Sequence, residues 1–179
     1  MRLRLLLWVT VLLGTAACGG AENGKEPAVT APSSITVTSP AFRDGETIPR
    51  KYTCDGEGVP PPLAWKDIPA NAGALALVVD DPDAPRGTFT HWVVLDLEAT
   101  AASLAEGGVP PGVKQAKNSG GKAGYYGPCP PNGTHHYRFT VYALSGPTGL
   151  LDGAGLGDAL KAIDAKTIAR GRLTAPYSR

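Results

Sequence analysis

Two loop motifs carry the residues of this chain that could bind a charged ligand. The first is Asp81-Pro82-Asp83-Ala84-Pro85, with His91 six residues beyond it, and the second runs from Gly127 to Gly133 and is followed by His135. Imidazoles exchange protons near neutral pH, carboxylates are negatively charged there, and proline and glycine restrict or shape the loop backbone. We therefore expect the two loops to meet at one end of the fold and form a site.

The side chains of these motifs predict a pocket for a small anion. If His91 and His135 are neighbours, Asp81 or Asp83 can accept a hydrogen bond from one imidazole nitrogen and fix which nitrogen faces the ligand. Backbone N–H groups of the glycine-containing loop would add donors for phosphate, sulfate or carboxylate, and a carboxylate would suit an ammonium group. The alternative is that each histidine is an ordinary core residue and that the aspartates cap their own turn.

Two histidines and two aspartates could also bind zinc and support hydrolysis, although their spacing is not that of a dense metal motif. The chain has no Gly-x-Ser-x-Gly elbow and no glycine-rich phosphate loop followed by Lys and Ser or Thr. A cysteine beside a histidine is a further candidate nucleophile. The prediction is a binding protein rather than an enzyme, with no catalytic residue, no metal and no cofactor.

Apolar runs predict the strands that position these loops. The run Leu75–Val79 is apolar on both faces and ends at the first loop, and Phe89–Leu97 resumes after it. Strict alternation in the second run places His91 on the face of Val93, Leu95 and Leu97. The same count from His135 places it with Tyr137, Phe139, Val141 and Ala143.

Shorter segments complete the predicted fold. Ile35–Ser39 and Leu63–Trp65 are further strands, Lys51–Cys54 is extended, and residues 98–123 form a long surface loop. One helix begins at Gly157-Asp158, with Asp158 as its cap, and ends at Gly171, before a short strand from Arg172 to Tyr177. The prediction is a mostly β protein, a two-sheet antiparallel sandwich with one late α-helix.

The N-terminal residues predict an export signal. Arg2 and Arg4 precede the apolar run Leu5–Leu13, and small residues lead to Cys18. This order is typical of export signals, and a cysteine directly after the small residues resembles the bacterial lipoprotein pattern. We therefore predict a signal peptide at residues 1–17, lipidation of Cys18 and an anchor in the bacterial cell envelope. Plain secretion is the alternative.

Composition predicts the remaining organisation. Residues 18–34 have the composition of a flexible tether, and residues 35–179 are enough for one domain. The 17 basic residues include the two arginines of the signal, so 15 remain against 16 acidic residues. This near-neutral balance argues against nucleic acid as a partner. Cys54 and Cys129 then form an even pair in an exported chain, either as a disulfide or as two buried thiols.

The two motifs resemble the signatures of the phosphatidylethanolamine-binding protein family, in its bacterial branch described as Raf-kinase-inhibitor-like. Supporting matches are Tyr52-Thr53-Cys54-Asp55-Gly56, Pro61-Pro62-Leu63-Ala64-Trp65 and the ending Leu173–Tyr177. The resemblance implies a two-sheet sandwich with a small pocket for phosphate-like groups. By motif position, the pocket residues that it implies are Asp81, Asp83, Pro85, His91, Gly127, Pro131, His135 and Tyr137. His136 stands where the family usually has Arg, and strand alternation turns it away from His135.

These observations favour an envelope-anchored protein that binds a small anion or a phospholipid head group. The alternative is an inhibitor of a protease or other envelope enzyme, acting through the loop from Ala99 to Ala123 and the pocket rim. Candidate partners are therefore the small ligand, the membrane through Cys18, an envelope enzyme and a second copy of the chain in a homodimer.

Overall fold

The computed structural model describes residue 32 and residues 34–179. The predicted signal peptide, Cys18 and nearly all of the tether lie outside the described residues. The described chain forms two antiparallel sheets and one α-helix, which confirms the predicted sandwich. The smaller sheet contains β1 (Thr36–Thr38), β2 (Leu63–Lys66) and β5 (Ser103–Leu104), in the order β1-β2-β5.

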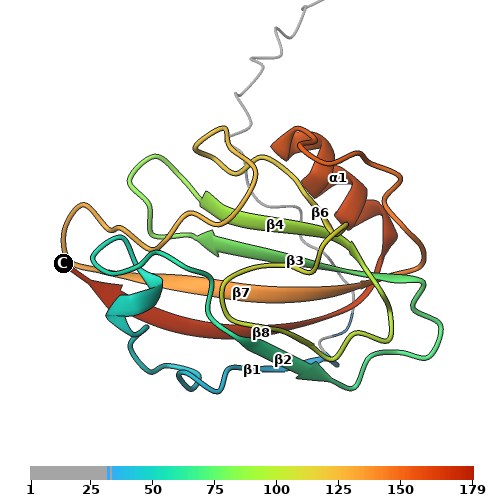
Figure 1. Cartoon of the computed structure of the whole chain (residues 1–179), viewed down its shortest axis with the longest axis horizontal. Coiled ribbons are helices and arrows are strands. Elements are labelled where there is room, and N and C mark those ends of the chain that lie inside the picture. The colour runs from blue at the N-terminus through green and yellow to red at the C-terminus, as the bar shows by residue number, and fades with distance from the viewer. Residues whose placement is uncertain (1–31, 33) are drawn as a thin grey trace, which may run out of the picture.

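The larger sheet has the strand order β6-β4-β3-β7-β8, and four of its strands run side by side across Figure 1. Its strands are β3 (Ala74–Asp81), β4 (Phe89–Leu97), β6 (Lys114–Gln115), β7 (Thr134–Leu144) and β8 (Thr167–Ser178). Every residue of β3 is buried. One apolar cluster fills the space between the sheets, and a second lies between the larger sheet and α1 (Leu156–Lys166). β3 therefore has an apolar layer on each side, which matches the apolar residues on both of its faces.

The helix differs from its predicted bounds at both ends. It begins at Leu156 after Gly155, and no side chain caps it, so Asp158 lies within its first turn. Thr167 already belongs to β8 and pairs with Leu144 of β7. The predicted C-terminal strand is thus the second half of a twelve-residue strand. Residues 167–171, which the sequence assigned to the helix, belong instead to β8, which pairs with β7.

Two loop predictions also need correction. The segment Lys51–Cys54, expected to be extended, begins within the 3-10 helix η1 (Arg50–Tyr52). Residues 98–123, expected to be a loop of low structure, contain β5 and β6, which pair with β2 and β4. Such two-residue strands are too short to produce a recognisable alternation in the sequence.

A β-bulge in β4 changes the direction of His91. Val79 pairs with Trp92 but Asp80 pairs with Thr90, so His91 is an extra residue on this strand. Its ring packs edge-on against Tyr137 in the core between the sheets, with the ring centroids 5.2 Å apart, whereas Val93 belongs to the cluster under α1. The prediction that His91 and Val93 share a face is therefore wrong, because a bulge shifts the alternation by one residue.

Candidate ligand-binding site

The loop between β3 and β4 and the segment leading into β7 lie at the same end of the molecule, together with the C-terminus (Figure 1). A cavity of about 580 Å³ opens between them. Its lining combines a carboxylate, an arginine, two imidazoles and two aromatic rings with small loop residues. These residues are Asp81, Ala84, Pro85, Arg86, Gly87, Thr88, Phe89, His91, Ser119, Tyr126, Cys129, Pro131 and His135.

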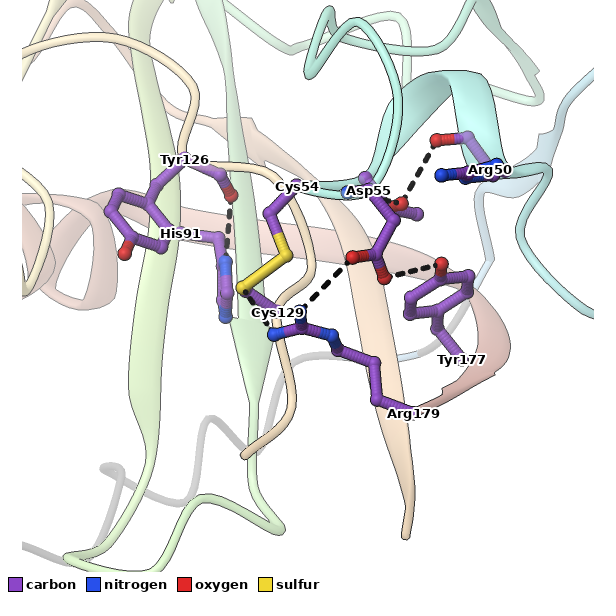
Figure 2. Close-up of a disulfide and its surroundings, with 9 residues drawn as sticks. Arg50, Cys54, Asp55, His91, Tyr126, Cys129, Tyr177 and Arg179 are labelled. Carbon is purple, nitrogen blue, oxygen red and sulfur yellow. Dashed lines mark hydrogen bonds and ion pairs between the residues drawn. A yellow bond between two sulfur atoms is a disulfide. The ribbon is translucent and has the colours of Figure 1, made fainter. Parts of the chain in front are cut away.

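His91 is held in the cavity wall by a main-chain carbonyl. Its Nδ1 lies 2.7 Å from the carbonyl oxygen of Tyr126, and the residue is only 3% exposed. Figure 2 shows the ring directed at this oxygen. Burial lowers the pKa of His91, although the Tyr126 carbonyl and the Asp81 carboxylate act in the opposite direction. The neutral ring is therefore favoured at pH 7.

His135 is held by a carboxylate instead. Its Nδ1 lies 2.7 Å from Oδ2 of Asp81, and both side chains are buried. The other carboxylate oxygen of Asp81 accepts the N–H of Asp83 at 2.8 Å, which fixes the carboxylate in the turn after β3. Asp81 thus orients His135, as expected for one of the two aspartates.

The hydrogen bonds at Nδ1 decide what Nε2 can do. A carbonyl or carboxylate oxygen only accepts, so Nδ1 of both His91 and His135 carries a proton. In a neutral ring, Nε2 then presents a lone pair, and it donates only when the imidazole is protonated. Neither Nε2 atom has a hydrogen-bond partner among the described residues, and both rings line the cavity. Each Nε2 can therefore accept a hydrogen bond from a ligand or, once the ring is protonated, donate one to an anion.

The second aspartate of the motif has a different partner. Oδ2 of Asp83 accepts hydrogen bonds from Nδ1 of His136 at 2.8 Å and from the His136 backbone N–H at 2.9 Å. These bonds lower the pKa of the Asp83 carboxyl group, the side-chain bond being the larger cause. The expectation that Asp83 braces a cavity histidine is wrong, because the backbone turn at Pro82 places it beside the outward-facing His136. As predicted, His136 points away from the buried His135.

The structure brings five of the expected pocket residues to the cavity wall: Asp81, Pro85, His91, Pro131 and His135. Asp83, Gly127 and Tyr137 are not part of the wall. Gly127 instead packs so tightly on the Thr53–Cys54 backbone that an added Cβ would lie 3.1 Å from the Cys54 nitrogen. The expected donor at Gly133 is also engaged, since its N–H binds the Arg179 carbonyl at 3.0 Å.

Tyr137 lies behind His91 rather than in the wall. Its side chain is fully buried, and its hydroxyl makes no hydrogen bond of standard geometry within the described part of the chain. Burial is the main cause that raises the pKa of Tyr137, so the phenol stays protonated. Its ring therefore supports His91 from the core side.

Eight residues of the wall were not predicted as pocket residues, and four of them, Arg86, Phe89, Ser119 and Tyr126, have contacts or a charge that matter for binding. Arg86 directly follows Pro85, and it forms no ion pair or hydrogen bond with any described residue. Ser119 reaches the cavity because its Oγ accepts the backbone N–H of Thr90 at 2.9 Å. The rings of Phe89 and Tyr126 flank His91, with centroids 4.8 and 5.8 Å from its ring. The available signals were the positions of Arg86 directly after the first motif and of Tyr126 directly before the second.

A disulfide joins the cavity wall to the loop after η1. Cys54 and Cys129, whose Cα atoms are 5.4 Å apart, are bonded across 75 residues of sequence. Beside this bond, the backbone N–H of Cys54 donates to the carbonyl of Pro128 at 3.1 Å. The sequence left open a disulfide or two buried thiols, and the structure contains the disulfide.

A family model described as phosphatidylethanolamine-binding protein matches residues 38–178. The chain belongs to this family. It is 40% identical over 186 residues to a Mycobacterium tuberculosis protein named as a lipoprotein, LppC, covering 96% of this chain and 92% of the relative. A protein of Methanothermobacter thermautotrophicus named UPF0098 is 42% identical and covers 78% of this chain and 95% of its own.

Solved structures of the phosphatidylethanolamine-binding protein family show the same fold. The crystal structure of Escherichia coli YbcL matches with a TM-score of 0.77 at 30% identity, covering 82% of this chain and 99% of YbcL. The Chlamydia trachomatis homologue CT736 matches with a TM-score of 0.76 at 38% identity and the same coverage. The fold that the motifs implied is therefore confirmed.

Three further observations concern the described residues. No helix among the described residues is long and apolar enough to cross a membrane. In the same part of the chain, no three His, Cys, Asp or Glu side chains are grouped so that they could hold a metal ion. The replacement of the usual family arginine by His136 lies outside the cavity wall, in the pair with Asp83.

Proposed function

We propose that the cavity binds a small oxyanion or the phosphate of a phospholipid head group, without chemical turnover. The observation that carries this proposal is the pair of buried imidazoles, each anchored at Nδ1 with Nε2 left for a ligand. Hydrogen bonds between a protonated imidazole and an anion are charge-assisted and stronger than neutral ones. Membership of the family supports a general binding role.

The rest of the wall suits such a ligand. Arg86 adds a permanent positive charge whose planar guanidinium can bind two oxygens of one phosphate. The Ser119 hydroxyl accepts the Thr90 N–H and keeps its own proton available for donation. Phe89 and Tyr126 present aromatic rings, which attract an ammonium group through the negative face of the ring. A phosphate linked to an aminoalkyl group would use both kinds of contact.

Sulfate binding should strengthen as the pH falls from 7 to 5. Sulfate carries no proton in this range, so it requires a protonated His91, whose pKa is lowered by burial. Affinity is therefore greatest below the pKa of His91 and falls above it, by about tenfold per pH unit when one proton is taken up. Calorimetric titration at several pH values, in buffers of different ionisation enthalpy, measures both the affinity and the protons taken up.

Replacement of Arg86 provides the control for this experiment. Arg86→Gln should weaken sulfate binding at every pH but should not alter how steeply the affinity changes with pH, because arginine does not titrate in this range. Phosphoethanolamine compared with inorganic phosphate then separates a head-group site from a site for free oxyanions. Absence of sulfate binding at pH 5, or an affinity that does not change between pH 5 and 7, would refute the proposed role of the imidazoles.

We further propose that a lipid on Cys18 anchors this domain to the cell envelope. The support is the N-terminal pattern of residues 1–18 and the similarity, over nearly the whole chain, to a relative named as a lipoprotein. We expect the mature protein to begin at Cys18 and to carry the mass of attached acyl chains. Mass spectrometry of protein from a bacterial membrane fraction tests this, and an unmodified Cys18 in the mature chain would contradict it.

A further inference from the structure

The disulfide in the cavity wall has two unequal sulfur atoms. Cys54 is exposed, whereas Cys129 is half-buried and contributes to the cavity lining. An attacking thiolate must approach along the S–S axis from outside, so the sulfur of the more exposed residue, Cys54, is the more accessible target. Accessibility alone therefore selects Cys54 as the sulfur that is attacked and Cys129 as the one that departs.

The charges around the disulfide select the same direction. Nη1 of Arg179 donates to Sγ of Cys129 at 3.4 Å, and its Nη2 lies 3.1 Å from Oδ1 of Asp55. Oδ2 of Asp55 accepts a hydrogen bond from the hydroxyl of Tyr177 at 2.8 Å. Figure 2 shows Arg179 at the Cys129 end of the bond and held by Asp55.

This arrangement stabilises a thiolate on Cys129 but not on Cys54. A guanidinium beside a sulfur favours its anionic form, and a more stable thiolate is a better leaving group. Asp55, next in sequence to Cys54, binds the guanidinium that contacts the Cys129 sulfur. The main chain of Arg179 is fixed by two backbone hydrogen bonds with Gly133, so its side chain starts from a defined position.

We infer that Cys54–Cys129 is a thiol-exchange site that controls the cavity. The thiolate of a low-molecular-weight thiol forms a bond to Sγ of Cys54, the S–S bond breaks, and its electron pair goes to Sγ of Cys129. The proton of the incoming thiol goes to solvent. A second thiol removes the adduct from Cys54, so that two thiols are oxidised to one disulfide while the protein gains two thiols.

The consequence for the cavity rests on the proposed function. The bond ties the segment containing Tyr126 and Cys129 to the loop at Cys54, and the Tyr126 carbonyl orients His91. Without the covalent bond, two hydrogen bonds still join these segments, one from Cys54 N–H to the Pro128 carbonyl and one from the Tyr125 hydroxyl to the Tyr52 carbonyl. Reduction therefore loosens the wall that holds His91, and oxyanion binding weakens.

The site of attack can be determined directly. The oxidised full chain is treated with glutathione, trapped with N-ethylmaleimide in mild acid, digested and analysed by mass spectrometry. We expect glutathione on Cys54 and the maleimide on Cys129, in excess over the reverse pattern by about tenfold or more. Glutathione mainly on Cys129, or no adduct under conditions that exchange an exposed model disulfide, would overturn the inference.

The role of Arg179 is tested by a variant that removes its charge, with a control variant that removes an equal charge elsewhere. Arg179→Gln should slow adduct formation on Cys54 by about three- to tenfold, through loss of leaving-group stabilisation. Lys161→Gln removes the same charge from the exposed face of α1 and should leave the rate unchanged. Equal rates in both variants would contradict the assigned role of the guanidinium.

Sulfate titration of the oxidised and the reduced protein at pH 5 tests the effect on the cavity. We expect at least a threefold lower affinity after reduction and recovery on reoxidation. Equal affinities would contradict the inferred effect of the disulfide on the cavity and would leave the proposed function intact. If the oxidised protein fails to bind sulfate, the proposed function and its control fail together, while the exchange at Cys54 is judged by its own adduct pattern.

Discussion

The double variant His91→Asn/His135→Asn is expected to lose sulfate and phosphate binding, with an affinity at least about a hundredfold lower at pH 5. Each protonated imidazole supplies a hydrogen bond to the anion, and a hydrogen bond to a charged group contributes roughly 1.5–3 kcal/mol. Two of them correspond to a loss of two or more orders of magnitude in affinity. Calorimetric titration measures this loss.

Asparagine is the informative replacement at both positions. Its side-chain amide can take the place of Nδ1, so the bonds to the Tyr126 carbonyl and to Asp81 can persist while the Nε2 position is deleted. Alanine would instead leave a buried carbonyl or carboxylate without its donor and would create a cavity, which lowers stability. The asparagine variant therefore separates loss of the ligand contact from loss of the fold.

His136 provides the matched control for the double variant. It lies next to His135 in sequence, also has an aspartate at Nδ1, and points out of the cavity. His136→Asn should leave sulfate binding within about twofold of the parent protein. If the double variant binds as tightly as the parent, or if His136→Asn weakens binding as strongly, the anion does not bind where the geometry of the two imidazoles indicates.

Removal of the disulfide is expected to lower the free energy of unfolding by about 4 kcal/mol. In the chain-entropy account, the loss of stability grows with the length of the loop that the bond closes, here 75 residues. For a domain of this size the change corresponds to a melting temperature lower by roughly 10–15 °C. Denaturant unfolding of Cys54→Ser/Cys129→Ser, against the oxidised parent, measures it.

The reduced parent protein is the control for this double variant, because it lacks the bond but keeps both sulfur atoms. The two forms should have the same stability within about 1 kcal/mol. A larger loss in the serine variant alone would show that packing of the sulfurs matters more than the crosslink. A loss below about 1 kcal/mol in both forms would contradict the entropic account for this protein.

The elements that the sequence predicts well are those whose apolar pattern matches their burial. β3 is buried on both faces, and its continuous apolar run shows this directly. The face shared by His135 and Tyr137 was also predictable, since β7 keeps its register with β8 through this region. The motif resemblance then gave the right family and sandwich fold.

The parts that sequence reasoning missed depend on contacts between distant segments. The bulge at His91 appears only when β4 pairs with β3, and strict alternation cannot anticipate it. Ser119 and Tyr126 reach the cavity because the segment before the second motif folds back onto β4, where their N–H groups bind the carbonyls of Thr90 and His91. Asp83 was assigned to the wrong histidine because the turn, and not the order of residues, decides which carboxylate faces the cavity.

The central place of β3 in the sheet has a consequence for chain synthesis. β3 pairs with β4, which follows it closely, and with β7, whose residues arrive roughly 60 positions later along the chain. A nascent or truncated chain that ends before Thr134 would leave one edge of an apolar strand open, which invites aggregation. Factors that keep incomplete chains unfolded would therefore matter more for this protein than for one whose neighbouring strands are all consecutive.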